Sequence, residues 1–155
     1  MATATVPDRI ERAIVLPASR ERVWAAVTQP EQLTQWMMGM VSDLDYRVGG
    51  EIHFVWKDEP SPYVGTIEAI EEPHRFAYRW FAYGVGHPHE QFPAQPLTLV
   101  EFILDEVAEG TRLTVVESGF AAMPAIYPAA ENYQSNTEGW TTLLNALESY
   151  LQRAA

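Results

Sequence analysis

The sequence predicts an α+β fold in which one antiparallel sheet carries a single long helix across one face. Between residues 41 and 118 most of the chain has the pattern of short strands joined by turns, and strands linked by hairpins pair antiparallel. One long segment with helical periodicity follows them, and two short helical segments follow the first strand. Strands followed by a helix are typical of α+β domains, and we expect six to seven strands.

Length and composition favour one globular domain. The 155 residues are enough for an ordinary core, since chains of this size bury roughly 70% of their unfolded surface. No repeat or linker divides the chain, so we expect a single domain over residues 9–153 after a flexible start at residues 1–8. The absence of Cys excludes disulfides, thiolate catalysis and Cys-ligated metals.

The charge of the chain argues against two classes of partner. Twenty-one acidic residues and ten basic ones give a net charge of -11, which repels phosphate backbones and anionic lipids. The N-terminus lacks the pattern of a signal peptide, and no stretch is long and apolar enough to cross a membrane. We therefore expect a cytoplasmic protein with no nucleic-acid partner and no membrane insertion.

The first strand is predicted at residues 9–16, where β-branched residues alternate loosely before Pro17. Ser19 is placed to cap a short helix that has Glu21 in its first turn. Pro30 ends that helix and suits the first turn of a second one, which continues through residues 31–37.

After Gly39 the apolar period changes from 3.6 to 2, which predicts strands joined by hairpins. Gly49-Gly50 is read as the turn of the first hairpin, and Gly110 as part of the last. Alternation in the first hairpin puts Ile52 and Phe54 on one face and His53 on the other. The predicted strands cover residues 41–48, 51–57, 63–72, 75–84, 98–107 and 111–118.

Residues 84–96 contain three Pro and two Gly, which predicts a loop. His87, His89 and Glu90 offer metal-ligating groups there, but no further His or Cys stands nearby, so we expect no metal site. The same loop could cover the mouth of a cavity.

The closing helix is predicted to begin near Pro128 or Glu131. We expect its last apolar residues, Leu147 and Leu151, to close the core, and we explain Gly139 by a close approach of the helix to the sheet. One side of the helix has large residues at steps of three and four. This stripe consists of Tyr133, Thr137, Trp140, Leu144, Leu147 and Leu151.

Aromatic residues are the main functional signal, with five Trp, seven Tyr and six Phe. Rings with polar tips suit a pocket for a planar apolar ligand, although they also fill ordinary cores. We favour the pocket. The predicted ligand-binding residues are Trp56, Phe76, Tyr78, Trp80, Phe102, Tyr133, Thr137, Trp140 and Leu144.

Two carboxylates interrupt otherwise apolar strands, Glu101 and Glu117. We expect both to face solvent or to pair with Arg79 or Arg112. The alternative is a carboxylate that faces a cavity with a raised pKa, which would be a candidate general acid or base. No Ser has a nucleophile-elbow setting and no Gly-rich phosphate loop occurs, so these two residues are the candidates for catalysis.

Five segments match a known family in order and spacing: "PASRERVWAAVTQPEQLTQWM", the Gly pair "GG", "GTIEAIEEPHRFAYRW", "VEFILDEVAEGTRLTVVESGF" and "GWTTLLNALESYL". In them the chain resembles the activator of heat-shock-protein-90 ATPase-like family. That family lies in the START-like or SRPBCC superfamily of helix-grip, Bet v 1-like folds. The resemblance implies a curved sheet that grips a long C-terminal helix. It also implies an apolar cavity, which in many relatives accepts a hydrophobic small molecule.

Three functional hypotheses follow. The first is a binding protein for a hydrophobic, aromatic or lipid-like molecule, without cofactor or metal. The second is an enzyme of the cyclase, aromatase or hydrolase kind that uses a cavity carboxylate. The third is a chaperone-associated activator of an ATPase, which the family name alone does not establish. Whether the chain forms a homodimer is left open by the sequence.

Overall fold

The computed structural model describes residues 7–37, 41–55, 63–80, 98–122 and 129–153. These residues form seven strands, three α-helices and one 3-10 turn, η2. The elements are β1 (Arg9–Leu16), α1 (Arg20–Thr28), α2 (Pro30–Trp36), β2 (Val41–Leu44), β3 (Glu51–Phe54), β4 (Tyr63–Glu71), β5 (Arg75–Trp80), β6 (Thr98–Val107), β7 (Gly110–Ser118), η2 (Phe120–Ala122) and α3 (Ala129–Arg153).

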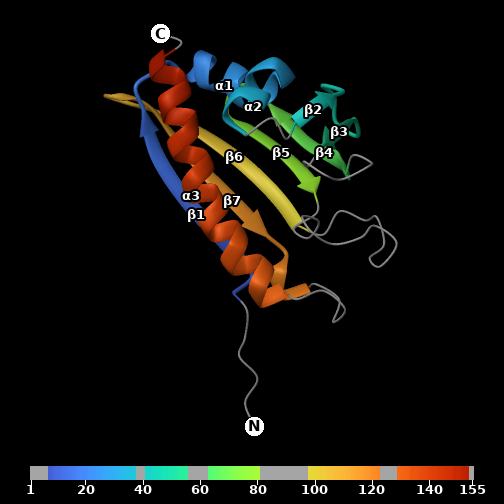
Figure 1. Cartoon of the computed structure of the whole chain (residues 1–155). Coiled ribbons are helices and arrows are strands. Elements are labelled where there is room, and N and C mark those ends of the chain that lie inside the picture. The colour runs from blue at the N-terminus through green and yellow to red at the C-terminus, as the bar shows by residue number, and fades with distance from the viewer. Residues whose placement is uncertain (1–6, 38–40, 56–62, 81–97, 123–128, 154–155) are drawn as a thin grey trace.

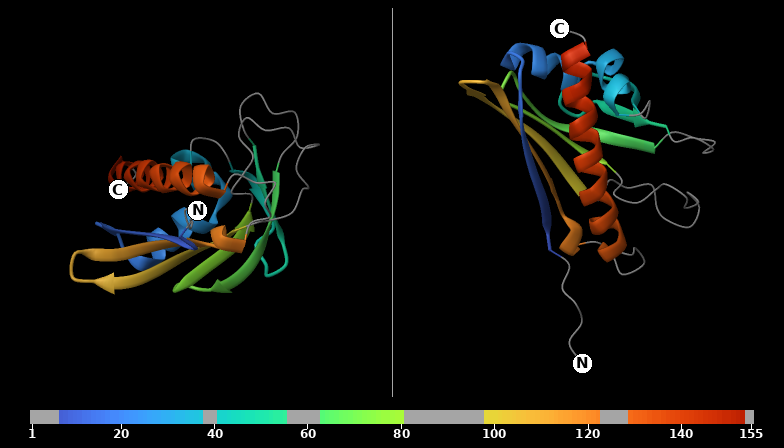
Figure 2. Two further views of the ribbon diagram at one scale, coloured as in Figure 1. Left: turned by 90° about the horizontal axis from the view of Figure 1, so that it is seen from below. Right: turned by 60° about the vertical axis from the view of Figure 1, so that its left-hand side comes forward.

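All seven strands belong to one antiparallel sheet in the order β1-β7-β6-β5-β4-β3-β2. The long helix α3 runs along one face of this sheet, and α1 and α2 lie near the C-terminal end of α3 (Figure 1). Seen from below, the sheet bends, so that the end formed by β4, β3 and β2 turns toward the side on which α3 lies (Figure 2). The predicted α+β helix-grip fold is confirmed.

Local sequence signals determine where the two short helices, α1 and α2, begin. The Ser19 hydroxyl oxygen accepts a hydrogen bond from the Arg22 backbone N–H at 3.2 Å, which caps α1 as predicted. Pro30 is the first residue of α2. At this position a backbone N–H would have no partner within the helix, so proline costs no hydrogen bond there.

The turn before β3 requires its two glycines. Gly49 has a φ of 85°, a conformation that favours glycine, and a Cβ on Gly50 would stand 2.1 Å from the Asp45 carbonyl oxygen. β2 ends at Leu44, earlier than predicted, because the backbone N–H of Arg47 turns back to bond the Asp45 carbonyl at 2.8 Å.

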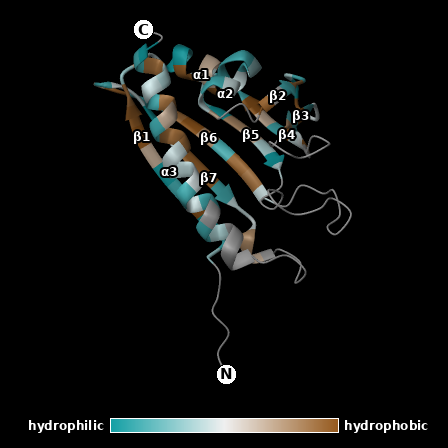
Figure 3. Cartoon of the chain, in the orientation of Figure 1, coloured by the Kyte–Doolittle hydropathy of each residue, from teal (hydrophilic) through white to brown (hydrophobic). Residues whose placement is uncertain are grey.

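Hydrophobic and hydrophilic residues both occur along the strands of the sheet (Figure 3), and on β3 and β6 buried residues alternate with more exposed ones. On β3, Ile52 and Phe54 are buried while Glu51 is exposed and His53 half-buried, which confirms the predicted faces. On β6, Glu101 and Ile103 lie on the outer face and are half-buried. The buried inner residues of β6 are Thr98, Val100, Phe102 and Leu104.

The C-terminal half of α3 is fixed to the rest of the domain. Leu147 and Leu151 are fully buried in the core, as predicted. The Arg22 guanidinium donates to the Leu151 carbonyl at 3.1 Å, and the Tyr150 hydroxyl donates to the Gln32 side-chain oxygen at 3.2 Å. These bonds hold this half of α3 against α1 and α2.

Gly139 does not mark a close contact, so that prediction is wrong. A Cβ at Gly139 would meet nothing within 4 Å. Because glycine costs a helix interior backbone entropy, Gly139→Ala is expected to raise the free energy of unfolding by about 0.5–1 kcal/mol. Urea unfolding monitored by circular dichroism measures this, with Gly50→Ala as the control that must destabilise. A destabilised Gly139→Ala protein would show that α3 packs more tightly at this point.

Several predictions fall outside the described residues. They are Trp56, the loop at residues 84–96, and within it His87, His89 and Glu90. Among the residues that the structure does describe, no group of three or more His, Cys, Asp or Glu could hold a metal ion.

Candidate functional site

Glu117 points inward from β7 and is completely buried. The expectation that it faces solvent or an arginine is therefore wrong. The alternation of the strand explains its direction, because Leu113 and Val115 face the core and Glu117 is the next residue in phase with them. A carboxylate at such a place requires dedicated partners inside the protein.

Glu101 lies on the outer face of the sheet, as expected, but its partner differs from the prediction. The Arg75 guanidinium donates to the Glu101 carboxylate at 2.8 Å. Arg79 pairs instead with Glu68 at 2.7 Å. Glu101 is thus a surface ion-pair residue, and Glu117 is the carboxylate that lies between sheet and helix.

Among the described residues, four side chains donate hydrogen bonds to Glu117. On Oε2, the Trp80 indole N–H donates at 2.7 Å and the Thr98 hydroxyl at 2.6 Å. On Oε1, the Trp140 indole N–H donates at 2.8 Å and the Asn136 amide at 3.0 Å, and Asn136 also reaches Oε2 at 3.1 Å. Two donors come from the sheet and two from α3, so one carboxylate connects both layers. We call these five residues the Glu117 cluster.

Sheet register and helix spacing bring the cluster together. Glu117 is directly opposite Val100, which makes Thr98 its diagonal neighbour on β6, and Thr98 is in turn opposite Trp80 on β5. Asn136 and Trp140 are four residues apart on α3 and share one face of the helix.

Burial is the largest influence on Glu117 and raises its pKa above the ordinary 4.5, while the four hydrogen bonds act in the opposite direction. With a raised pKa the folded state holds this proton more tightly than the unfolded state. The contribution of Glu117 to stability is therefore greatest at low pH and decreases as pH rises from the ordinary Glu pKa through the folded-state value.

The pH dependence can be isolated with Glu117→Gln, which cannot ionise. We expect the free energy of unfolding of the wild type minus that of the variant to fall as pH rises through this window, and to level off above it. Urea titrations of both proteins from about pH 4 to about pH 8 measure it. A difference that increases with pH would mean that the four donors outweigh burial and lower the pKa.

Tyr78 carries a second buried polar group beside the Glu117 cluster. It is opposite Val100 on β5, and Val100 is opposite Glu117, so the three side chains share the inner face of adjacent strands. Burial, followed by the negative charge of Glu117, raises the pKa of Tyr78 well above the usual phenol value. Its hydroxyl is buried and has no hydrogen-bond partner among the described residues. A neutral O–H donor is thus available inside the domain.

Aromatic rings surround this hydroxyl. The Tyr78 ring is 5.7 Å from both Phe54 and Trp80 and 6.0 Å from Phe102, between ring centroids. Trp140 on α3 contacts Trp80 at 5.7 Å and Phe102 at 5.9 Å. The polar groups of Tyr78 and Glu117 therefore lie inside a layer of rings contributed by both the sheet and α3.

The structure brings most of the predicted ligand-binding residues together. Six of them are buried in one continuous core: Phe76, Tyr78, Trp80, Phe102, Trp140 and Leu144.

Tyr133 and Thr137 lie only half-buried on α3. The Tyr133 ring contacts Phe120 at 5.4 Å and its hydroxyl donates to the Arg9 carbonyl at 3.3 Å, while the Thr137 hydroxyl bonds the Tyr133 carbonyl of its own helix at 2.7 Å.

Thr98 and Asn136 were missed from the sequence. Asn136 had a detectable signal in the sequence, because it precedes Trp140 by four residues and therefore lies on the same side of the helix. Thr98 had none, since its contact with Glu117 depends on the register between β6 and β7.

A pocket lined by described residues opens beside α1, and no residue of the Glu117 cluster lines it. No predicted ligand-binding residue lines it. No helix in the described part of the chain combines the length and the apolar character needed to span a membrane.

A family model described as "Activator of Hsp90 ATPase homolog 1-like protein" matches residues 17–152. No curated protein matches the chain significantly.

Solved structures share the fold. Protein MLL2253 from Mesorhizobium loti is 24% identical, with 95% of this chain and 98% of that one covered and a TM-score of 0.73. DynU16, a protein of the dynemicin biosynthetic locus, is 26% identical at a TM-score of 0.70, and the match covers 95% of this chain but 48% of DynU16. The Aha1 dimer from Colwellia psychrerythraea is 19% identical at a TM-score of 0.68, with 92% and 95% covered.

Proposed function

Since the chain belongs to the Activator of Hsp90 ATPase homolog 1-like protein family, we propose that it binds a hydrophobic, aromatic or lipid-like small molecule between its sheet and α3. The observation that carries the proposal is the Tyr78 hydroxyl, a neutral donor buried among aromatic rings with no partner in the described residues. Buried polar groups normally find a partner, and a hydrogen-bond acceptor on a ligand would supply one.

The ligand in this proposal has an apolar or aromatic body and one acceptor group, such as a carbonyl. The body would lie among the rings and the acceptor would face the Tyr78 hydroxyl. The proposed contact residues are Trp56, Phe76, Tyr78, Trp80, Phe102, Tyr133, Thr137, Trp140 and Leu144.

Native mass spectrometry of freshly purified protein is the first test. We expect a small molecule to remain bound to the purified protein, so that its mass adds to that of the chain, and to be released when the protein is denatured. A homogeneous apo mass, together with no saturable binding of the naphthalene probes described next, would reject the proposal.

A pair of probes tests the role of Tyr78. 2-Acetylnaphthalene carries a carbonyl acceptor, whereas 2-ethylnaphthalene has a similar shape and none. Tyr78→Phe is expected to weaken binding of the first about three- to tenfold, the range of one neutral hydrogen bond, and to leave the second unchanged. Tyr150→Phe is the control, because its hydroxyl bonds Gln32 on α2. Equal effects of Tyr78→Phe on both probes would exclude the hydrogen bond.

A second candidate function is acid–base catalysis by Glu117, because this buried carboxylate has a raised pKa. It requires one of the four donors to release a carboxylate oxygen, since both oxygens already accept hydrogen bonds. Incubating the co-purified molecule with wild type and with Glu117→Gln separates the two functions. Conversion by the wild type alone supports catalysis, and an unchanged ligand mass in both supports binding.

A homodimer is also proposed, in line with the dimer of the Colwellia psychrerythraea relative. Light scattering after gel filtration is expected to give twice the mass of one chain. A single-chain mass at high protein concentration would contradict it.

A further inference from the structure

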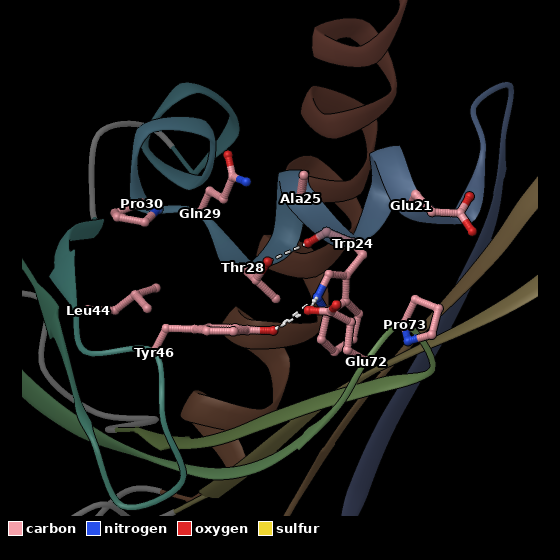
Figure 4. Close-up of a pocket in the computed structure, with 10 residues that line it drawn as sticks. All are labelled: Glu21, Trp24, Ala25, Thr28, Gln29, Pro30, Leu44, Tyr46, Glu72 and Pro73. Atoms are coloured by element: carbon pink, nitrogen blue, oxygen red, sulfur yellow. Dashed lines mark hydrogen bonds between the residues drawn. The ribbon is translucent and has the colours of Figure 1, made fainter.

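A pocket of about 560 Å³ opens beside α1, within the size range of small-molecule sites. Four segments form its walls: α1, the start of α2, the end of β2 with the residues after it, and the turn between β4 and β5 (Figure 4). The lining residues that carry chemistry are Glu21, Trp24, Tyr46 and Glu72.

Glu72 is the centre of the polar groups in this pocket. Its Oε1 accepts a hydrogen bond from the Trp24 indole N–H at 2.9 Å and another from the Tyr46 hydroxyl at 2.8 Å. In Figure 4 the Tyr46 ring extends across the pocket with its hydroxyl directed at this carboxylate. Both donors are neutral, so they orient the carboxylate without cancelling its charge.

No cation of the described residues neutralises the pocket. Lys, Arg and His are absent from its lining as the structure describes it. Arg20, next to Glu21 in the chain, is directed elsewhere: its guanidinium lies 3.6 Å from Glu106 and 3.3 Å from the His74 ring. Glu72 and Glu21 thus leave two uncompensated negative charges at this pocket, on a chain of net charge -11.

The other walls suit the rest of a small molecule. Trp24 and Tyr46 provide aromatic surface next to Glu72, and ring faces attract cations. Burial, followed by the hydrogen bond to Glu72, raises the pKa of Tyr46, which keeps its phenol neutral. Pro30 and Leu44 add apolar contacts.

We propose that this pocket binds a small organic cation, with its ammonium group against Glu72, Trp24 and Tyr46. Its apolar part lies against Pro30 and Leu44. Aromatic rings beside a carboxylate are the chemistry that recognises alkylammonium groups. The site shares no residue with the proposed sheet–helix site, so a negative result for one site does not contradict the proposal for the other.

Choline and its neutral isostere 3,3-dimethylbutan-1-ol are the probes, because they differ mainly in charge. Nuclear magnetic resonance titration follows the indole N–H signals, with Trp24 assigned by its loss in Trp24→Phe. We expect choline to shift the Trp24 signal saturably, the isostere to bind at least fivefold more weakly, and added salt to weaken choline binding.

Glu72→Gln tests the carboxylate. The amide keeps an oxygen that accepts from Trp24 and Tyr46, so the pocket retains its shape and loses only the charge. We expect at least fivefold weaker choline binding, and no change in Glu138→Gln, which removes an exposed charge on α3.

Three results would overturn the proposal: equal affinity for the two probes, unchanged choline binding by Glu72→Gln, or a shift confined to Trp80 or Trp140, which would put the cation in the sheet–helix site. If Glu72→Gln does not fold, the salt series on the wild type decides, and binding that salt leaves unchanged rejects the site.

Discussion

Glu117→Leu is expected to lower the free energy of unfolding by about 3–5 kcal/mol, the range for removing one partner from a buried charged network. Leucine fills a similar volume but accepts no hydrogen bond. The Trp80 and Trp140 indoles, the Thr98 hydroxyl and the Asn136 amide would all lose their acceptor at once. Each unsatisfied buried donor costs about 1–3 kcal/mol, and relaxation of the site recovers part of the sum.

Urea unfolding of Glu117→Leu, Glu117→Gln and Glu101→Gln measures this effect. Glu117→Gln keeps one acceptor oxygen and is expected to fall between the wild type and Glu117→Leu. Glu101→Gln is the control, because it removes a carboxylate with one arginine partner on the outer face and is expected to cost about 1 kcal/mol or less. Equal stability of Glu117→Leu and the wild type would show that the four donors find other acceptors.

Phe102→Ala is expected to cost about 3–5 kcal/mol, as large-to-small changes at fully buried aromatic positions do. Phe102 contacts rings from three different elements of the fold. Its centroid is 6.2 Å from Trp36 on α2, 6.5 Å from Phe76 on β5 and 5.9 Å from Trp140 on α3. Because these neighbours belong to three separate elements, they cannot move together to fill the cavity that the alanine would leave.

Thermal and urea unfolding of Phe102→Ala measure the loss. Ile103→Ala is the matched control, since Ile103 is the next residue on β6 and lies half-buried on the outer face. We expect it to lose less than half as much stability as Phe102→Ala. Equal losses of stability would contradict the assignment of Phe102 to the inner face of β6 and of Ile103 to its outer face.

The fold could be predicted because its signals are local. Ser19 caps α1 through the residue three positions later, Pro30 begins α2, and the Gly49-Gly50 pair favours a turn because glycine adopts positive φ at little cost. Each signal depends on a few neighbouring residues and on no distant contact.

The inward direction of the Glu117 side chain was predictable in principle, but two signals in the sequence opposed each other. Leu113 and Val115 alternate in phase with Glu117, and this pattern indicated an inner position. The general preference of carboxylates for water argued the other way. The donors that reverse this preference, at Thr98 and Asn136, each stand 19 residues away along the chain, so only the three-dimensional structure identifies them.

The pocket beside α1 had no signal of its own in the sequence. Trp24 and Glu72 are 48 residues apart, and Tyr46 is 26 residues from Glu72. Their meeting depends on how the turn between β4 and β5 packs against α1, which no local pattern encodes.

The Glu117 cluster has a consequence for how α3 is seated. Sliding the helix by one turn, about 5.4 Å, in one direction would bring Leu144 to the place of Trp140, because the two residues are four positions apart on the same stripe. An aliphatic side chain would then face a buried carboxylate. A slide in this direction would therefore exchange a donor to Glu117 for a side chain that cannot donate, so the Glu117 cluster opposes it and helps to fix the register of α3 on the sheet.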